Sequence, residues 1–323
     1  MRAAVCRRYG GPEVVELADV PMPSPGDNEV LVRVTASTVN RTSASIRAAI
    51  PPFGARLAYG LTKPRRAILG TDFAGTVERV GSDVRGMDIG DRVFGFDDRL
   101  MGAHAEFAVF PASAAIHKTP DGVSDEDAAA CVEGAHYAST YVERAALEPG
   151  QRALVYGGGG AIGTAAIQLL RAADVEVVAV AEGHQLELMT RLGAAEVVDV
   201  RVEDFTTLGE SFDLVLDAVG KTRFGVCRPL LRPGGMFMAT ELGPRLENIR
   251  LAVTTRVRGD RRVHFPLPRH SRRHVAMTGD ALANGTLQSV IDRRTTLDQI
   301  VEAYRYVDAA AKTGSVVLRV ADA

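Results

Sequence analysis

Short apolar segments separated by turns fill the first part of the chain. Residues 9–12 and 21–27 are rich in glycine and proline, which commonly interrupt strands. The strand candidates between such turns are residues 1–5, 14–17, 30–36, 71–80 and 92–96. Short strands at this spacing, with glycine at the corners, are typical of a small Greek-key barrel. The pattern therefore predicts an all-β domain over residues 1–122.

From residue 123 the pattern changes to strands that alternate with helices. Ser124 begins an alanine-rich helical segment whose first turn is acidic, as a helix N-terminus favours. The strand candidates here are residues 153–156, 175–180, 197–200, 214–218 and 236–239, with a turn at 233–235. This alternation predicts a doubly wound parallel sheet of the α/β class over residues 123–265. We expect residues 266–323, which end in a strand at 315–320, to return to the first domain.

Two segments carry no regular pattern of either kind. Residues 43–64 are irregular and mix apolar with basic residues. A loop of that length is usually functional or mobile, so we interpret it as a lid over a site. Residues 256–273 are rich in arginine, which favours a solvated surface strand and turn because charge runs usually face water. A clamp for an anionic substrate is the alternative interpretation of this second segment.

A glycine-rich loop within residues 153–170 is the strongest motif in the chain. An apolar strand, a tight turn and a helix succeed one another, and Gly158, Gly160 and Gly163 fit the pattern G-x-G-x-x-G. The first glycine permits the turn, the second lets a pyrophosphate approach the backbone, and the third lets the helix pack on the strand. Glu182 follows the next strand, about 20 residues further on, where this kind of fold holds the adenosine ribose. The loop predicts a dinucleotide site; a glycine-rich turn that binds nothing is the alternative.

Composition narrows the class of protein further. The 323 residues are 46% hydrophobic, and the net charge of -2 gives no electrostatic reason to expect nucleic acid or an anionic membrane as a partner. The three cysteines, Cys6, Cys131 and Cys227, are far apart and form neither a disulfide framework nor a metal-type pair. The chain shows no apolar leader after Met1 and no apolar run long enough to span a bilayer. We therefore expect a soluble, cytoplasmic protein.

Several motifs, in order along nearly the whole chain, resemble those of one enzyme family. They are residues 9–14, 39–40, 69–77, 90–95, 192–199 and 213–220, together with the glycine loop. In this combination the chain resembles the zinc-free, zeta-crystallin-like quinone oxidoreductase branch of the medium-chain dehydrogenases/reductases. The resemblance implies a GroES-like β-barrel catalytic domain (residues 1–122, completed by 266–323), a Rossmann domain (123–265) and a cofactor cleft between them. It also implies a homodimer joined through edge strands of the Rossmann sheets.

Departures from the zinc-dependent relatives indicate the type of reaction. Those relatives carry Gly-His-Glu where this chain has Gly70-Thr71-Asp72, and a loop of four closely spaced cysteines that is absent here. Without these ligands we expect no zinc site of the family type and no Lewis-acid activation of an alcohol. The resemblance implies instead that NADPH or NADH delivers a hydride to a quinone or an α,β-unsaturated carbonyl substrate. The alternatives are an enoyl-thioester reductase of lipid or secondary metabolism and a non-catalytic dinucleotide-binding protein.

Three residues are candidates for catalytic work beside the nicotinamide. Asn40 matches the family asparagine near the nicotinamide ribose, with a turn-capping side chain as the alternative. His136 stands where relatives often place a threonine, and a histidine can donate the proton that follows hydride addition. The alternative for His136 is a helix residue hydrogen-bonded in the core, whereas Tyr137 is a second donor or shapes the pocket. The weaker candidates, which we interpret as mainly structural, are Glu133, Thr42 and Asp72.

The cofactor is predicted to contact the glycine loop and the ends of three Rossmann strands. The residues are Gly157, Gly158, Gly160, Ala161, Ile162, Gly163, Glu182, Val219, Thr240 and Leu242. Relatives that favour NADPH place a small residue at the position of Glu182 and a cation shortly after it, whereas here Gly183, His184 and Gln185 follow. A carboxylate at Glu182 accepts hydrogen bonds from a ribose diol and repels a 2′-phosphate, unless Arg201 binds that phosphate. The family favours NADPH and the residues favour NADH, so both stay open.

Overall fold

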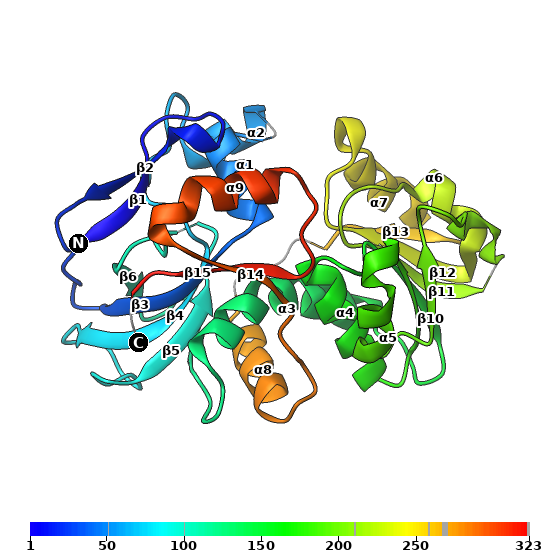
Figure 1. Ribbon diagram of the computed structural model, residues 1–323. Coiled ribbons are helices and arrows are strands. Elements are labelled where there is room, and N and C mark those ends of the chain that lie inside the picture. The colour runs from blue at the N-terminus through cyan, green and yellow to red at the C-terminus, as the bar shows by residue number, and fades with distance from the viewer. Residues whose placement is uncertain (51, 100, 210, 258, 267–270, 322–323) are drawn as a thin grey trace. The chain divides into compact units, whose positions relative to one another are not determined.

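The computed structural model (Figure 1) describes most of the chain. The residues described are 1–50, 52–99, 101–209, 211–257, 259–266 and 271–321. The chain divides into unit 1, made of Met1–Glu133 and His270–Ala323, and unit 2, made of Gly134–Arg269. The boundary between them lies inside the long helix α3 (Asp125–Ala145), later than the change of pattern at residue 123. It lies there because ion pairs tie the first turn of α3 to strands of unit 1.

Unit 1 is built around a seven-stranded sheet that includes strands from both ends of the chain (Figure 1). Its strands are β3 (Glu29–Val39), β4 (Asp72–Val80), β5 (Arg92–Phe96), β6 (Phe107–Pro111), β7 (Ile116–Lys118), β14 (Ile291–Thr296) and β15 (Ser315–Arg319). Their order is β14-β15-β3-β4-β5-β7, and β6 also pairs with β3. β15 runs antiparallel to β3, with Val316 opposite Val39, so the last strand is part of this sheet. β1 (Arg2–Cys6) and β2 (Val15–Asp19) form a separate antiparallel pair.

The core of unit 1 consists largely of apolar side chains that these strands bury against one another. Val30, Val32 and Val34 of β3 are completely buried. Phe73 of β4 stacks on Phe110 of β6, with ring centroids 3.9 Å apart. Such burial contributes about 2 kcal/mol for each large side chain. The short antiparallel strands predicted for this part of the chain are confirmed, and β6 and β7 add two that the sequence pattern did not indicate.

The segment predicted as an irregular loop is helical. Its helices are α1 (Arg41–Ala48) and α2 (Pro52–Tyr59). Asn40 caps α1, because its Oδ1 accepts a hydrogen bond from the Ser43 amide at 2.8 Å. The buried face of α1 includes the polar residues Ser43 and Arg47. Because these buried positions are not apolar, the sequence lacks the apolar repeat that indicates an amphipathic helix. The prediction of an irregular loop over 43–64 is therefore wrong, although residue 51 lies outside the described residues.

A buried arginine holds α1 to the rest of unit 1. Arg47 is only 1% exposed, and its guanidinium pairs with Asp308 at 2.6 Å and donates to the Gly10 carbonyl oxygen at 2.5 Å. A guanidinium is tolerated at such a depth only with partners of this kind. The remaining helices of unit 1 are α8 (Arg272–Ala283) and α9 (Ile300–Asp308).

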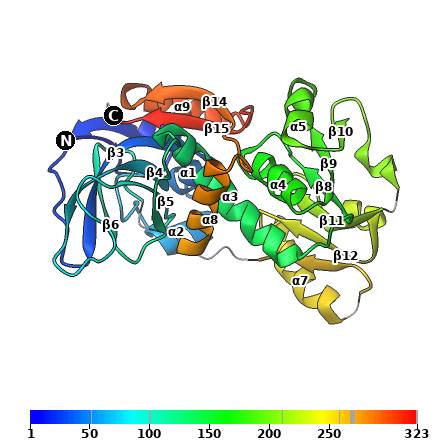
Figure 2. The same cartoon turned by 90° about the horizontal axis from the view of Figure 1, so that it is seen from below.

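Unit 2 is a six-stranded parallel sheet with helices on both faces (Figure 2). Its strands are β8 (Arg152–Tyr156), β9 (Glu176–Ala181), β10 (Glu196–Asp199), β11 (Phe212–Asp217), β12 (Leu231–Ala239) and β13 (Arg262–His264). Its helices include α4 (Ala161–Ala172), α5 (Leu186–Leu192), α6 (Phe224–Cys227) and α7 (Glu247–Val257). The strand order β10-β9-β8-β11-β12-β13 reverses at β8, as in the doubly wound dinucleotide-binding fold. The predicted α/β fold class is confirmed.

Both faces of the unit 2 sheet are covered, which explains its apolar strands. In Figure 2, α4 and α5 lie over one face and α7 lies over the other. Ala153, Leu154 and Val155 of β8 are accordingly all fully buried. The turn predicted at 233–235 is wrong, because these residues form an irregularity within β12, where the register with β11 shifts. Gly234 makes this possible with a φ of 85°, a value that favours glycine.

The arginine-rich segment lies partly outside the described residues, which omit 258 and 267–270. The remaining part comprises the end of α7, the edge strand β13 and the start of α8. Arg256 and Arg262 are exposed, as expected of a solvated surface strand and turn. Among the helices that the structure describes, none is long and apolar enough to cross a membrane.

Candidate active site

The glycine loop joins β8 to α4 and is packed too tightly for side chains. Gly157 has a φ of 80°, and a Cβ at this position would come 2.5 Å from a methyl group of Val219. A Cβ on Gly163 would overlap the carbonyl oxygen of Gly157, so this glycine lets the start of α4 lie against the loop. Two of the glycines therefore serve the turn and the close packing of the helix.

Gly160 leaves an open cradle at the start of α4. It is the N-cap residue of this helix, and no side chain caps the helix here. A Cβ at Gly160 would have no neighbour closer than 3.6 Å, so there is room for a ligand next to the backbone. The first amides of a helix, here those of Ala161, Ile162 and Gly163, lack intrahelical acceptors and carry the positive end of the helix dipole. These features fit the diphosphate of a dinucleotide.

The cradle lies where the strand order reverses, between the carboxyl ends of β8 and β11. Asp217 ends β11 and is completely buried, and its carboxylate accepts hydrogen bonds from the amides of Val219, Gly220 and Thr222 at 3.1, 2.8 and 2.9 Å. Burial raises the pKa of Asp217, and these amide bonds oppose the rise. Asp217 thus fixes the loop that places Val219 against Gly157, at the switch point where such sheets bind ligands.

Thr240 and Leu242 follow β12, the next strand of the same sheet. Both are partly exposed, and the Thr240 amide donates to the Asp217 carbonyl oxygen at 3.0 Å. The structure thereby brings together the carboxyl ends of β8, β11 and β12, and the predicted residues Gly157, Val219 and Thr240 lie at these ends.

Glu182 ends the loop after β9 and carries an ion pair. Its carboxylate binds the guanidinium of Arg201 at 3.1 Å, and both side chains are more than one-third exposed. Glu182 also caps the short turn that follows it, in a reciprocal arrangement with Gln185. Asp199 lies close by at the end of β10, because a Cβ on Gly183 would come 2.5 Å from its carboxylate. Two carboxylates and one arginine thus meet at this corner of unit 2.

In unit 1, Asn40 and Asp72 form a buried polar network. Asn40 is 4% exposed, and its Nδ2 donates to the Thr71 hydroxyl at 2.7 Å and to the Asp72 carboxylate at 2.8 Å. Asp72 is completely buried and also accepts hydrogen bonds from the amide and the hydroxyl of Thr38, both at 2.6 Å. Burial raises the pKa of Asp72, and these hydrogen bonds oppose the rise. The capping role of Asn40 is thus present, and its role beside the nicotinamide stays a prediction.

Glu133 and Lys312 form a second polar group of unit 1, and both are partly exposed. Desolvation raises the pKa of Glu133 to about 8, and the negative charge of Asp72 adds to the rise. A hydrogen bond with Thr42 and the positive charge of Lys312 act in the opposite direction. Desolvation lowers the pKa of Lys312. No sequence pattern indicated Lys312, which lies far along the chain from every motif.

His136 and Tyr137 lie on the part of α3 that belongs to unit 2, whereas Asn40 belongs to unit 1. His136 is 1% exposed, and its ring stands perpendicular to that of Tyr137, with centroids 5.9 Å apart. Their role as proton donors stays a prediction. Gly134, which the sequence did not single out, lets α3 approach α4, because a Cβ there would come 2.5 Å from the carbonyl oxygen of Ala161.

Comparison with known proteins identifies the family. The alcohol dehydrogenase GroES-like domain matches residues 26–121, and the zinc-binding dehydrogenase domain matches residues 192–318. A chloroplast envelope quinone oxidoreductase homolog of Arabidopsis thaliana is 30% identical over 256 residues, covering 76% of either chain. The chain belongs to the quinone oxidoreductase branch of the medium-chain dehydrogenases/reductases.

Other members of this branch and its superfamily agree over almost the whole length. The 2-methylene-furan-3-one reductase of Solanum lycopersicum is 26% identical, over 98% of this chain and 79% of the relative. The quinone oxidoreductase structure from Coxiella burnetii superposes with a TM-score of 0.88 at 25% identity, over 99% of each chain. The mycobacterial Rv1454c structure complexed with NADPH gives a TM-score of 0.81 at 26% identity, again over 99% of each chain. The GroES-like and Rossmann parts expected from the sequence are therefore both present.

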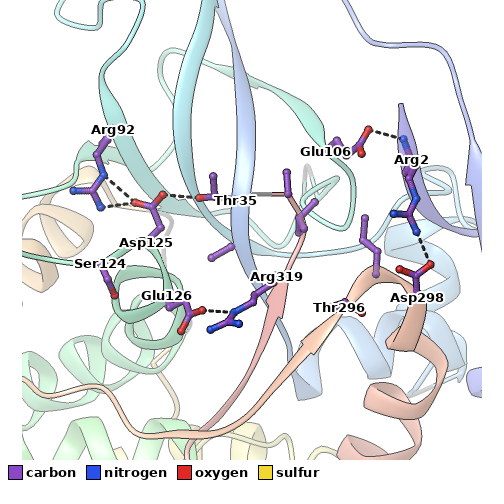
Figure 3. A pocket seen from close by; sticks show the side chains of 14 residues that line it. Arg2, Thr35, Arg92, Glu106, Ser124, Asp125, Glu126, Thr296, Asp298 and Arg319 are labelled. Carbon is purple, nitrogen blue, oxygen red and sulfur yellow. Dashed lines mark hydrogen bonds and ion pairs between the residues drawn. The ribbon is translucent and has the colours of Figure 1, made fainter. Parts of the chain in front are cut away.

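This quinone oxidoreductase-like chain also has a charged hollow in unit 1, shown in Figure 3. Its volume is about 930 Å³. Arg92 pairs with Asp125, and Arg319 pairs with Glu126, each at 2.5 Å. No residue predicted to bind the cofactor or to act in catalysis lines this hollow. The paired charges anchor the first turn of α3 to the sheet.

Proposed function

We propose that the protein is an NAD(P)H-dependent oxidoreductase that reduces quinones or α,β-unsaturated carbonyls without zinc. The diphosphate cradle at Gly160, located at the switch point of a doubly wound sheet, is the observation that carries the proposal. Relatives named as quinone oxidoreductases and as a 2-methylene-furan-3-one reductase support the class of acceptor. The nicotinamide supplies the hydride when it is bound, and the protein supplies position and electrostatics.

The chain's own residues divide between holding the cofactor and shaping the acceptor site. The backbone amides at the start of α4 hold the diphosphate. Val219 and Thr240 lie beside this cradle, at the carboxyl ends of the neighbouring strands. Asn40, fixed by its bonds to Thr71 and Asp72, orients the nicotinamide end. A side chain that is already held by hydrogen bonds loses little entropy on binding, which favours such an orienting role.

We further propose that NADH is preferred over NADPH. Glu182 offers a carboxylate to the ribose hydroxyls, and Asp199 adds a second negative charge at the same corner. Arg201, the cation that could hold a 2′-phosphate, is already paired with Glu182. A phosphate would have to displace one carboxylate and accept the proximity of another. A structural neighbour of 26% identity was solved with NADPH, so the preference that we propose depends on these particular residues.

The zinc-free mechanism rests on the chemistry of the polar network in unit 1. Where zinc-dependent relatives carry histidine and glutamate, Thr71 and Asp72 are bonded to Asn40 instead. A hydroxyl and an amide are poor zinc ligands, and the one carboxylate present, that of Asp72, accepts hydrogen bonds from Thr38 and Asn40 instead. Among the described residues, no three His, Cys, Asp or Glu side chains are grouped so as to hold a metal ion.

A homodimer is the assembly that we propose. β13 forms one edge of the unit 2 sheet, although its Val263 amide already donates to the Thr255 hydroxyl of α7. The adjacent helix α7 exposes Ile249, Val253 and Val257, which are 41%, 65% and 79% exposed and lie on one helix face. A second copy would cover this apolar stripe and extend the sheet.

The test of the function is turnover. We expect the purified protein to oxidise NADH, and NADPH more slowly, with a panel of quinones and enones. Tight cofactor binding without turnover of any acceptor would contradict the proposal and favour a non-catalytic dinucleotide-binding protein. Turnover confined to enoyl thioesters would favour the alternative reductase.

A further inference from the structure

The segment of unit 1 between β3 and β4 is basic and contains no acid. Residues 40–71 include neither aspartate nor glutamate. The exposed cations of this segment are Arg41, Arg56, Lys63, Arg65 and Arg66. The net charge of -2 conceals them, because the acids that balance them lie elsewhere in the chain. A charged surface such as a membrane responds to the local charge of a protein as well as to its net charge.

The second half of this segment is held in place by its own contacts. In Figures 1 and 2, α2 lies at the outside of unit 1, and residues 56–66 comprise its last turn and the loop that follows; we name them the α2 patch. The Tyr9 hydroxyl donates to the Gly60 carbonyl oxygen at 2.7 Å. The guanidinium of Arg56 lies over the Tyr9 ring, 5.4 Å from its centroid. The α2 patch is therefore anchored to the start of the chain.

Large apolar side chains of the α2 patch are exposed next to these cations. Leu57 is 61% exposed and Leu61 is 66% exposed, and the two lie on either side of Gly60 in the chain. Ile50, which precedes α2, is 59% exposed. Single exposed apolar residues are common on soluble proteins, but several within one short segment indicate a surface that another apolar phase covers.

The charges of the α2 patch remain positive in its folded surroundings. The guanidinium groups of Arg56 and Arg65 donate to backbone carbonyl oxygens at 3.4 and 3.3 Å, and these contacts do not neutralise their charge. Asp97 and Asp98, which follow β5, are the acids that act on Tyr59 at the end of α2. Asp97 is only 4% exposed, and Arg99 follows Asp98 with an opposite charge. The surface therefore keeps an excess of positive charge.

We propose that the α2 patch docks the protein on a membrane surface that contains anionic lipids. Its cations attract the headgroup phosphates, and Leu57 and Leu61 enter the boundary between headgroups and acyl chains. A nucleic acid would neutralise the same cations but offers no apolar layer to the leucines, so the combination favours a bilayer. The contact is peripheral, because α2 has only eight residues. The proposal does not depend on the reaction, since docking needs neither cofactor nor acceptor.

The first experiment measures how much purified protein sediments with lipid vesicles. One set of vesicles is pure phosphatidylcholine, and the other contains about one-third phosphatidylglycerol, which is anionic. We expect binding to the anionic vesicles at about 0.1 M salt. The affinity should fall at least about tenfold at about 1 M salt, where the screening length shortens from about 10 to about 3 Å. Protein that stays in the supernatant with anionic vesicles at low salt would overturn the inference.

The contribution of charge is tested by a triple variant in which Lys63, Arg65 and Arg66 are each replaced by glutamine. One cation near an anionic membrane raises the affinity about fivefold, so we expect binding about a hundredfold weaker. The matched control makes the same exchange at three exposed arginines outside the α2 patch, namely Arg79, Arg85 and Arg191. The two triple variants have the same net charge. An equal loss of binding in both would show that the α2 patch is not the docking surface.

Insertion of the leucines is tested with a tryptophan probe, because the chain contains no tryptophan of its own. The fluorescence of Leu61→Trp should shift to shorter wavelength with anionic vesicles, since the indole leaves water for the membrane interface. Ile89→Trp, at an apolar position that is 71% exposed elsewhere in unit 1, is the control and should show no shift. An unchanged spectrum of Leu61→Trp in protein that sediments with the vesicles would show a purely electrostatic contact and would overturn the proposal.

Discussion

Replacing Glu182 by glutamine should weaken the discrimination between NADH and NADPH. The substitution keeps the shape of the side chain and its ability to cap the turn with Gln185, but it removes the negative charge and releases Arg201. The released guanidinium can then bind the 2′-phosphate. The fold should be little affected, because an exposed ion pair of this kind is worth about 1 kcal/mol or less.

The size of the effect follows from the charges and their exposure. The 2′-phosphate carries a charge of about -1.5 to -2. Unit charges about 4 Å apart interact by about 1 kcal/mol in a water-like medium, which is appropriate because Glu182 and Arg201 are 37% and 69% exposed. Loss of the repulsion and gain of the arginine should each contribute roughly 1.5 kcal/mol. Together they amount to about a hundredfold change in relative affinity.

The assay compares kcat/KM for NADH and NADPH with one acceptor at fixed ionic strength, because salt screens exposed charges. Glu187→Gln is the matched control, since Glu187 is 87% exposed and pairs with Arg191 on the neighbouring helix. A ratio that changes less than threefold in Glu182→Gln would refute the reasoning. A wild-type enzyme that prefers NADPH would refute it as well.

Three further predictions concern binding, pH and assembly. Gly160→Asp should abolish NADH binding measured by fluorescence titration while preserving the fold, since its Cβ meets nothing within 3.6 Å; Gly225→Asp, equally open, should still bind. His104 is completely buried, and desolvation lowers its pKa to about 4, with a backbone hydrogen bond to Thr38 acting against this. The unfolded chain therefore takes up the proton first, so stability falls as pH drops from 6.5 to 4, and His104→Gln should lose less in Tm over that range. Val253→Glu should convert a dimer to a monomer in light scattering, and a wild-type monomer would contradict the assembly that we propose.

The features that could be predicted from the sequence were those that depend on one short, continuous stretch of residues. The strand, turn and helix around Gly160 depend on residues within one segment, so their spacing alone indicated them. The helix α1 escaped prediction because tertiary contacts place Arg47 and Ser43 on its buried face. Its capping residue, Asn40, reads equally well as a turn.

The polar group formed by Glu133 and Lys312 could not be predicted from the sequence pattern, for a different reason. Glu133, Asp72 and Lys312 come from three distant segments, and only the folded sheet brings them together. A charge near another charge changes its proton affinity, and no local pattern records that proximity. Similarly, the ion pair between Glu182 and Arg201 depends on the pairing of β9 with β10.

The pairing of β15 with β3 has a consequence for how the protein is made. During synthesis, residues 29–39 leave the ribosome long before residues 315–319, and all of unit 2 emerges in between. Until β15 is synthesised, β3 therefore lacks this partner strand, whereas every strand of the unit 2 sheet has already been made. Shortening the chain before Ser315 should leave this side of β3 without its partner strand and the product prone to retention by chaperones.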